Sequence, residues 1–108
     1  MFSKLAAAGL LLCGMAAPAA AAALKVEGDY DHGRQLALPC QGCHGVPDYR
    51  NPYPRFRVPR IAGQPAAYLV RALEDYRQGR RRHATMQAQA RDFSDQDIAD
   101  LAVYLSAQ

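Results

Sequence analysis

The sequence predicts a small all-α domain, and three observations lead to that fold class. Apolar residues recur at the helical spacing i, i+3, i+4 and i+7 in three separate segments. Residues typical of helix starts or ends flank these segments. The long connection over residues 45–64 carries prolines at a density that opposes both a helix interior and a central strand. With 108 residues, the chain has the length of one domain.

The N-terminal segment has the pattern of an export signal. Lys4 precedes an uncharged run with an apolar first half and an alanine-rich second half, which offers small-residue cleavage sites. We therefore expect residues 1–23 to be a signal peptide cleaved near Ala23, which leaves a domain over residues 24–108 and directs the protein to the periplasm. The alternative is an uncleaved anchor, because the run is near the length that spans a bilayer. Contact with a membrane is expected only in that alternative.

The first predicted helix covers residues 33–40, shortly after two aspartates. Its apolar face consists of Gly33, Leu36, Ala37 and Cys40. A glycine in a helix interior costs about 1 kcal/mol relative to alanine, so we expect another helix to approach Gly33 closely. Pro39 removes one helical hydrogen bond and is expected to distort the turn before Cys40.

Two further helices are predicted in the second half of the chain. The earlier one opens with Pro65 at the first helical position and ends at Gly79, which suits a left-handed C-terminal cap. The later one begins with Ser94 as its N-terminal cap. We expect Met86 to lie in a polar loop between them. The buried stripes are Leu69, Ala72, Leu73 and Tyr76 in the earlier helix, and Ile98, Leu101, Ala102 and Leu105 in the later one.

The chain is organised around the stretch Cys40-Gln41-Gly42-Cys43-His44. Two cysteines three positions apart place both thiols on the same side of a helical turn, and a histidine follows at once. C-x-x-C-H is the sequence signature of c-type haem attachment. Each thiol can add to a haem vinyl group, and a histidine is a standard axial ligand of the iron. We therefore predict one haem c, covalently bound through Cys40 and Cys43, with His44 as the proximal ligand.

Three other interpretations of this stretch were weighed. A thioredoxin-like redox pair requires a βαβ setting, which the sequence does not resemble. A structural zinc site requires four ligands, so it would have to recruit His32 or His83. His32 is instead expected at the surface. A structural disulfide is compatible with export but leaves the adjacent histidine unexplained.

The sixth iron ligand is predicted to be Met86. Of the three methionines, it is the only one beyond the expected signal peptide. A lone methionine is usually core filler, but the neighbours of Met86 are polar and it belongs to no continuous apolar stripe. Thioether sulfur is a soft ligand that stabilises ferrous iron and raises the reduction potential. His83 is the competing donor and would give a bis-histidine haem.

These motifs make the chain resemble the class I cytochromes c of bacterial periplasms, both the small monohaem kind and one half of the tandem dihaem kind. The resemblance runs from Gly33 to Leu105, and a single haem motif is present. It implies a class I cytochrome c fold, with three to five helices wrapped around one covalent haem. It also implies that the N- and C-terminal helices cross at Gly33, and that the Pro59 carbonyl accepts a hydrogen bond from His44. Its landmarks, besides the C-x-x-C-H motif, are Pro59-Arg60-Ile61-Ala62-Gly63-Gln64, Tyr68-Leu69, Tyr76-Arg77-Gln78-Gly79-Arg80, Met86 and Leu101-Ala102-Val103-Tyr104-Leu105.

The function expected from these features is electron transfer by a carrier that is not itself an enzyme. With both axial positions filled, no open iron site remains for chemistry. The first alternative is a haem subunit that passes electrons to or from a periplasmic oxidoreductase complex. The second is a gas-binding or sensing haem protein, which requires Met86 to be absent from the iron.

Partners are expected to be redox proteins with an acidic docking surface. Clustered charge speeds the association of oppositely charged partners, and seven arginines are expected to converge around the haem rim. The alternative is an ordinary solvated surface on which one or two arginines neutralise haem propionates. Nucleic acid is not an expected partner, because the predicted signal peptide exports the protein. The seven arginines are Arg50, Arg55, Arg57, Arg60, Arg80, Arg81 and Arg82.

Overall fold

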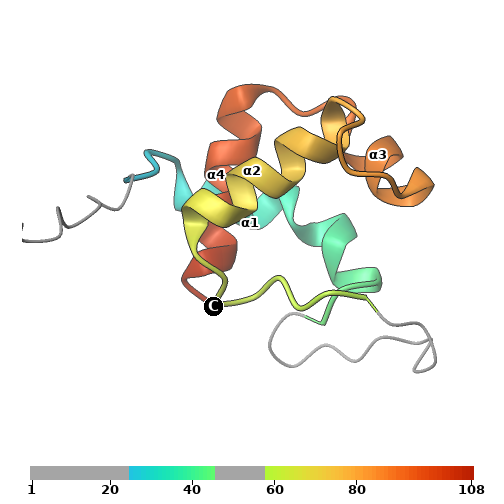
Figure 1. The fold of residues 1–108 in the computed structure, drawn as a ribbon. Coiled ribbons are helices and arrows are strands. Elements are labelled where there is room, and N and C mark those ends of the chain that lie inside the picture. The colour runs from blue at the N-terminus through green and yellow to red at the C-terminus, as the bar shows by residue number, and fades with distance from the viewer. Residues whose placement is uncertain (1–24, 46–57) are drawn as a thin grey trace, which may run out of the picture.

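The computed structural model describes residues 25–45 and 58–108, and helices dominate both ranges (Figure 1). No strand occurs in these two ranges, which confirms the predicted all-α class. The expected signal peptide lies outside the described residues, as do Arg50, Arg55 and Arg57. The helices are α1 (Tyr30–Leu36), the 3-10 helix η1 (Leu38–Gly42), α2 (Ala66–Arg77), α3 (Ala84–Ala90) and α4 (Asp95–Ser106). Among the described helices, none has the length and apolar character needed to cross a membrane.

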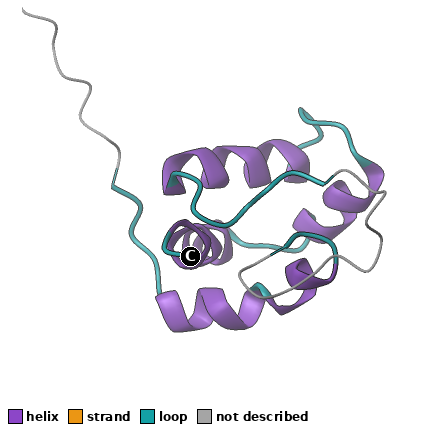
Figure 2. Ribbon diagram, turned by 90° about the horizontal axis from the view of Figure 1, so that it is seen from below, coloured by secondary structure: helices purple, strands orange, loops and turns teal. Residues whose placement is uncertain are grey.

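Helix α4 forms the centre of the fold, with α1 and α2 packed on either side of it (Figure 2). Its predicted stripe is the core: Ile98, Leu101, Ala102 and Leu105 are each at most 3% exposed. Ala37 from the end of α1 and Leu69 from α2 belong to one hydrophobic cluster with Leu101, Ala102, Tyr104 and Leu105. Burial of these side chains supplies most of the stabilisation, because each aliphatic side chain removed from water contributes about 1.5–3 kcal/mol.

Helices α1 and α4 touch at Gly33, as the sequence predicted. A Cβ atom on Gly33 would lie 2.0 Å from the Asp100 carbonyl oxygen and 2.9 Å from the Tyr104 Cβ. No side chain fits in this space, so the helices cross with backbone against backbone. Tyr104 continues the contact by packing edge-on against Tyr30 of α1, with ring centroids 5.2 Å apart.

The chain changes from one kind of helix to another before the cysteine motif. Helix α1 ends at Leu36, and η1 follows with Pro39 in its first turn. The distorted turn expected at this proline is therefore present, because a residue without an N–H is tolerated only at a helix start. Helix η1 carries Cys40 and leads directly to Cys43 and His44.

The ends of the two longer helices follow the predicted signals closely. Pro65 was expected at the first helical position of α2 and instead occupies the N-cap, one position earlier than the first helical residue Ala66. Gly79, just beyond the end of α2, has a φ of +77°, a left-handed conformation that favours glycine. At the start of α4, the Ser94 hydroxyl accepts from the Asp97 N–H at 3.0 Å, while the Asp97 carboxylate accepts from the Ser94 N–H at 2.9 Å. This reciprocal pair is a capping box.

The expectation that Met86 lies in a loop is wrong, because this residue belongs to helix α3. His83 caps α3: its Nδ1 accepts a hydrogen bond from the Met86 N–H at 3.3 Å. Histidine is not among the usual cap residues, so the start signal was not recognised. The alanines of the segment favour a helix even though their neighbours are polar.

We predict that Gly33→Ala destabilises the protein by about 3 kcal/mol or more, because the added methyl group overpacks the crossing of α1 and α4. Denaturant unfolding of the purified protein measures the change. Gly42→Ala is the matched control, since no atom lies within 4 Å of a Cβ built there. Equal stability of the two variants would contradict the tight crossing.

Candidate haem site

A cavity of about 190 Å³ lies among η1, the segment before α2, and helices α2, α3 and α4. Its walls are largely aliphatic and aromatic, with Ile61, Leu69, Leu73, Tyr76, Leu101 and Leu105 among them. Cys40, Cys43, His44 and Met86 line the same cavity. A mostly apolar pocket with a few convergent polar groups is the usual form of a cofactor site.

His44 is held in a defined orientation. The residue is only 7% exposed, and its Nδ1 lies 2.7 Å from the carbonyl oxygen of Pro59. A carbonyl oxygen can only accept, so Nδ1 carries the proton and donates it. In the neutral ring, Nε2 then keeps its lone pair. The side chain is therefore in the tautomer that can bind a metal ion through Nε2.

The two thiols come from one tight turn. The Cys43 and His44 N–H groups both donate to the Cys40 carbonyl oxygen, at 3.2 and 2.9 Å. Both cysteines are free thiols, Cys40 partly buried and Cys43 exposed. Burial raises the pKa of Cys40, and the neighbouring Cys43 adds to this effect while a backbone hydrogen bond opposes it. The turn thus presents both thiols and one imidazole at one end of the cavity.

The structure brings Met86 to the cavity and leaves His83 outside its lining. Met86 projects from α3 and is partly buried, whereas His83 is exposed. The Nδ1 of His83 is already used as the cap of α3. Of the two candidate sixth ligands, only Met86 therefore reaches the same space as His44. Within residues 25–45 and 58–108, no group of three or more histidine, cysteine, aspartate or glutamate side chains is arranged to hold a metal ion.

The basic run after α2 divides into different environments. Arg80 pairs with Asp75, with its Nε 2.7 Å from the carboxylate. Arg81 turns toward the cavity, where its guanidinium lies 4.8 Å from the centroid of the Tyr76 ring and 3.4 Å from the Tyr68 hydroxyl. Arg82 is exposed.

Several cavity-lining residues were given no role in the cavity by sequence reasoning, among them Phe93 and Gln89. Phe93 immediately precedes the Ser94 cap, and its carbonyl accepts from Arg77 Nη1 at 2.9 Å. An apolar residue just before a helix cap often packs against the first turn, and this signal could have identified Phe93 as buried. Gln89 also lines the cavity, one turn after Met86 on α3.

A helical fold with an apolar cavity beside a C-x-x-C-H turn defines a class of small haem-binding proteins. The chain belongs to the cytochrome c family, because the model of that family matches residues 30–108. Members of this family carry covalently bound haem c and transfer electrons. The class I cytochrome c fold expected from the sequence is thereby confirmed.

Curated relatives support the same family. The chain is 38% identical over 81 residues to cytochrome c4 of Pseudomonas aeruginosa, an alignment that covers 75% of this chain and 39% of that protein. It is 38% identical over 84 residues to cytochrome c-554(548) of Halomonas halodenitrificans, covering 75% of this chain and 98% of that protein. It is 34% identical over 105 residues to the cytochrome subunit of sulfide dehydrogenase of Chlorobaculum tepidum, covering 93% of this chain and 91% of that protein. The chain thus spans about two fifths of its cytochrome c4 relatives.

Proposed function

We propose that this chain is a periplasmic electron carrier with one haem c, bound through Cys40 and Cys43 and ligated by His44 and Met86. The observation that carries the proposal is the tautomer of His44, which its hydrogen bond to Pro59 determines. Its Nδ1 donates to the Pro59 carbonyl, so Nε2 is left as a ligand in the cavity that Met86 also lines. Two soft or borderline donors from separate elements match the preference of a haem iron.

Each residue of the site has a distinct task in this proposal. When bound, the haem supplies the one-electron chemistry. Cys40 and Cys43 anchor it, and the Pro59 carbonyl fixes the ring of His44 and increases its basicity. Met86 favours the ferrous state and raises the potential. The apolar walls exclude water, while Arg60 and Arg81, which also line the cavity, can face the carboxylates of the haem.

The attachment is tested by extraction. We expect acidified organic solvent to leave the haem on the wild-type polypeptide, because thioether bonds survive denaturation. Replacing Cys40 and Cys43 together by alanine is expected to abolish retention. Release of haem from the wild-type protein would refute covalent attachment.

The sixth ligand is tested by spectroscopy of the oxidised protein. We expect the weak near-infrared band of sulfur-to-iron charge transfer in the wild type and its loss in Met86→Ala, which also opens the iron to added imidazole. His83→Ala is the control. It should keep the band and lose about 1 kcal/mol of stability, because only the cap of α3 is removed. Absence of the band from the wild type, together with loss of the native spectrum in His83→Ala, would instead assign the iron to His83.

Docking to an acidic redox partner is proposed from the distribution of arginines. Arg60 and Arg81 line the cavity. Arg82, which follows Arg81 in the sequence, is exposed. The pairing of Arg80 with Asp75 neutralises one charge of this group. The remaining positive charge would attract an anionic surface at a rate that falls as salt screens it.

We predict that ferricyanide oxidises the reduced protein faster at low than at high ionic strength, whereas a cationic cobalt(III) phenanthroline complex shows the opposite dependence. Arg82→Gln should reduce the ferricyanide rate at low salt several-fold. Lys25→Gln removes the same charge in the segment before α1 and should change the rate less. Stopped-flow kinetics measure these rates. Equal effects of the two substitutions would leave Arg82 as ordinary surface charge.

A second candidate function is that of a haem subunit within an oxidoreductase complex. The specific observation in its favour is the similarity to the cytochrome subunit of sulfide dehydrogenase over 91% of that protein's length. Purification from the native host at low salt distinguishes the two functions. A free carrier elutes alone, whereas a subunit elutes with a dehydrogenase that holds its own flavin or metal.

A further inference from the structure

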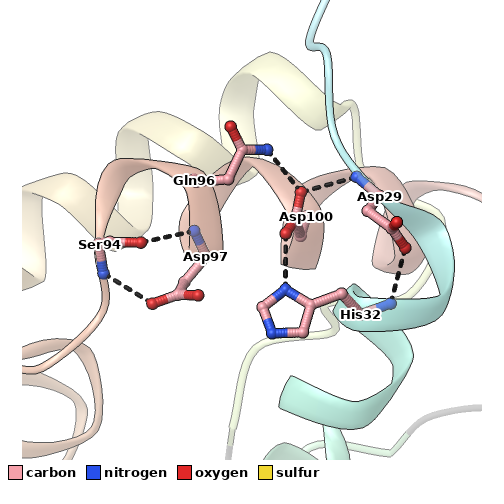
Figure 3. A network of polar contacts seen from close by, with 6 residues as sticks. All are labelled: Asp29, His32, Ser94, Gln96, Asp97 and Asp100. Carbon is pink, nitrogen blue, oxygen red and sulfur yellow. Dashed lines mark hydrogen bonds and ion pairs between the residues drawn. The ribbon is translucent and has the colours of Figure 1, made fainter.

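A buried carboxylate lies where α1 crosses α4, and none of its partners lines the haem cavity. The Asp100 residue is only 2% exposed. Its Oδ1 accepts from the Asp29 N–H at 2.6 Å and from Gln96 Nε2 at 2.7 Å, and its Oδ2 lies 2.7 Å from His32 Nδ1 (Figure 3). Residues 68 positions apart in the sequence therefore meet at this carboxylate.

The charge of Asp100 requires compensation, because a buried carboxylate without a partner is costly. Among the ion pairs found in the described part of the chain, His32 is its one cationic partner. The side chain of His32 is 47% exposed, so it exchanges protons with solvent while its Nδ1 stays on Asp100. Asp100 is thus fixed in the core, whereas His32 gains or loses its proton as the pH of the solvent changes.

We propose that His32 and Asp100 form a proton-operated clamp that ties α1 to α4 most strongly when His32 is protonated. Protonated His32 makes a charge-assisted hydrogen bond to the carboxylate. Neutral His32 can still donate from Nδ1, but the attraction between opposite charges is gone. The clamp goes beyond the electron-transfer function and does not depend on the identity of the iron ligands.

The position of the clamp makes it effective. The carbonyl of Asp100 is the group that meets Gly33, while its side chain is held by His32, one position earlier in α1. The same carboxylate also fixes the Asp29 N–H at the start of α1. Helix α1 leads within a few residues to Cys40 and His44. Loosening this one residue therefore weakens the support of the segment that carries the haem motif.

The charged groups around His32 and Asp100 favour the protonated histidine and the ionised carboxylate that the clamp requires. The hydrogen bond to Asp100 raises the pKa of His32 above its ordinary value of 6.5, desolvation opposes this, and the carboxylates of Asp97 and Asp29 add to it. Burial alone would raise the pKa of Asp100, but hydrogen bonds from His32, the Asp29 N–H and Gln96 bring it below its ordinary value. No other titratable group acts appreciably on His32 among those described.

The direction of the pH dependence follows from these shifts. A raised pKa in the folded state means that the folded protein binds the proton more tightly than the unfolded chain does. The stabilisation by His32 is therefore complete below about pH 6.5, the ordinary pKa, and is lost as the pH rises through the raised value. On the acid side, the contribution of Asp100 is lost as the pH falls through its lowered pKa. The clamp is strongest in mildly acidic solution.

The experiment compares guanidinium unfolding of the oxidised haem-loaded protein between pH 5 and pH 9. Relative to His32→Gln, the unfolding equilibrium constant of the wild type should rise with pH above the ordinary histidine pKa, by at most tenfold per pH unit. His83→Gln is the matched control: it removes a histidine that forms no ion pair within the described residues and should show the pH dependence of the wild type. A flat difference between the wild type and His32→Gln would overturn the clamp.

Ligation of the iron by His32 in the unfolded chain would give the same trend, because deprotonation frees the imidazole to bind a metal. Asp100→Asn separates the two causes, since it keeps His32 and removes the carboxylate. If the clamp is correct, the pH dependence of unfolding that His32 causes disappears in Asp100→Asn. If His32 instead binds the iron in the unfolded chain, that pH dependence persists. NMR titration of His32 in the native wild type is the second measurement and needs no stable variant. A native pKa at or below 6.5 would also overturn the proposal.

Discussion

The rest of the structure depends on the contact between the backbones of α1 and α4. The site for a Cβ on Gly33 is taken by the carbonyl of Asp100, so the first and last helices approach more closely than any side chain permits. This contact places Ala37 in the core beside Leu101 and orients η1, which begins two residues after α1 ends. The thiols and His44 thereby acquire fixed positions relative to α4. The precision of the haem site thus originates at a helix crossing outside the site.

The sequence predicted those elements whose signals are local. The stripe of α4 and its Ser94 cap are as expected, because each residue of the stripe faces packed neighbours. The stripe of α2 was interpreted with less success. Leu69 is buried, whereas Leu73 and Tyr76 are only partly buried and line the cavity. Helical periodicity identifies an apolar face, but it does not distinguish a face that packs on protein from one that encloses a ligand.

The failures concern contacts between distant residues and unusual caps. The helix that contains Met86 was not predicted, because a histidine cap is a weak start signal in a sequence. His32 was expected at the surface, and its side chain is indeed half exposed, but its bond to Asp100 joins positions 68 residues apart. Asp100 itself is an acidic residue on an amphipathic helix, which without tertiary information indicates a solvated position.

The cavity also has a consequence for the order in which the protein is assembled. Its walls come from η1, the segment before α2, and helices α2, α3 and α4, so these elements lack apolar contact with one another where the cavity lies. Apolar wall surface left exposed to water there forfeits about 25 cal/mol per Å² of stabilisation. Bound haem would cover this surface, so we expect the fold to gain stability when haem binds. Haem attachment and the completion of folding are therefore expected to be coupled.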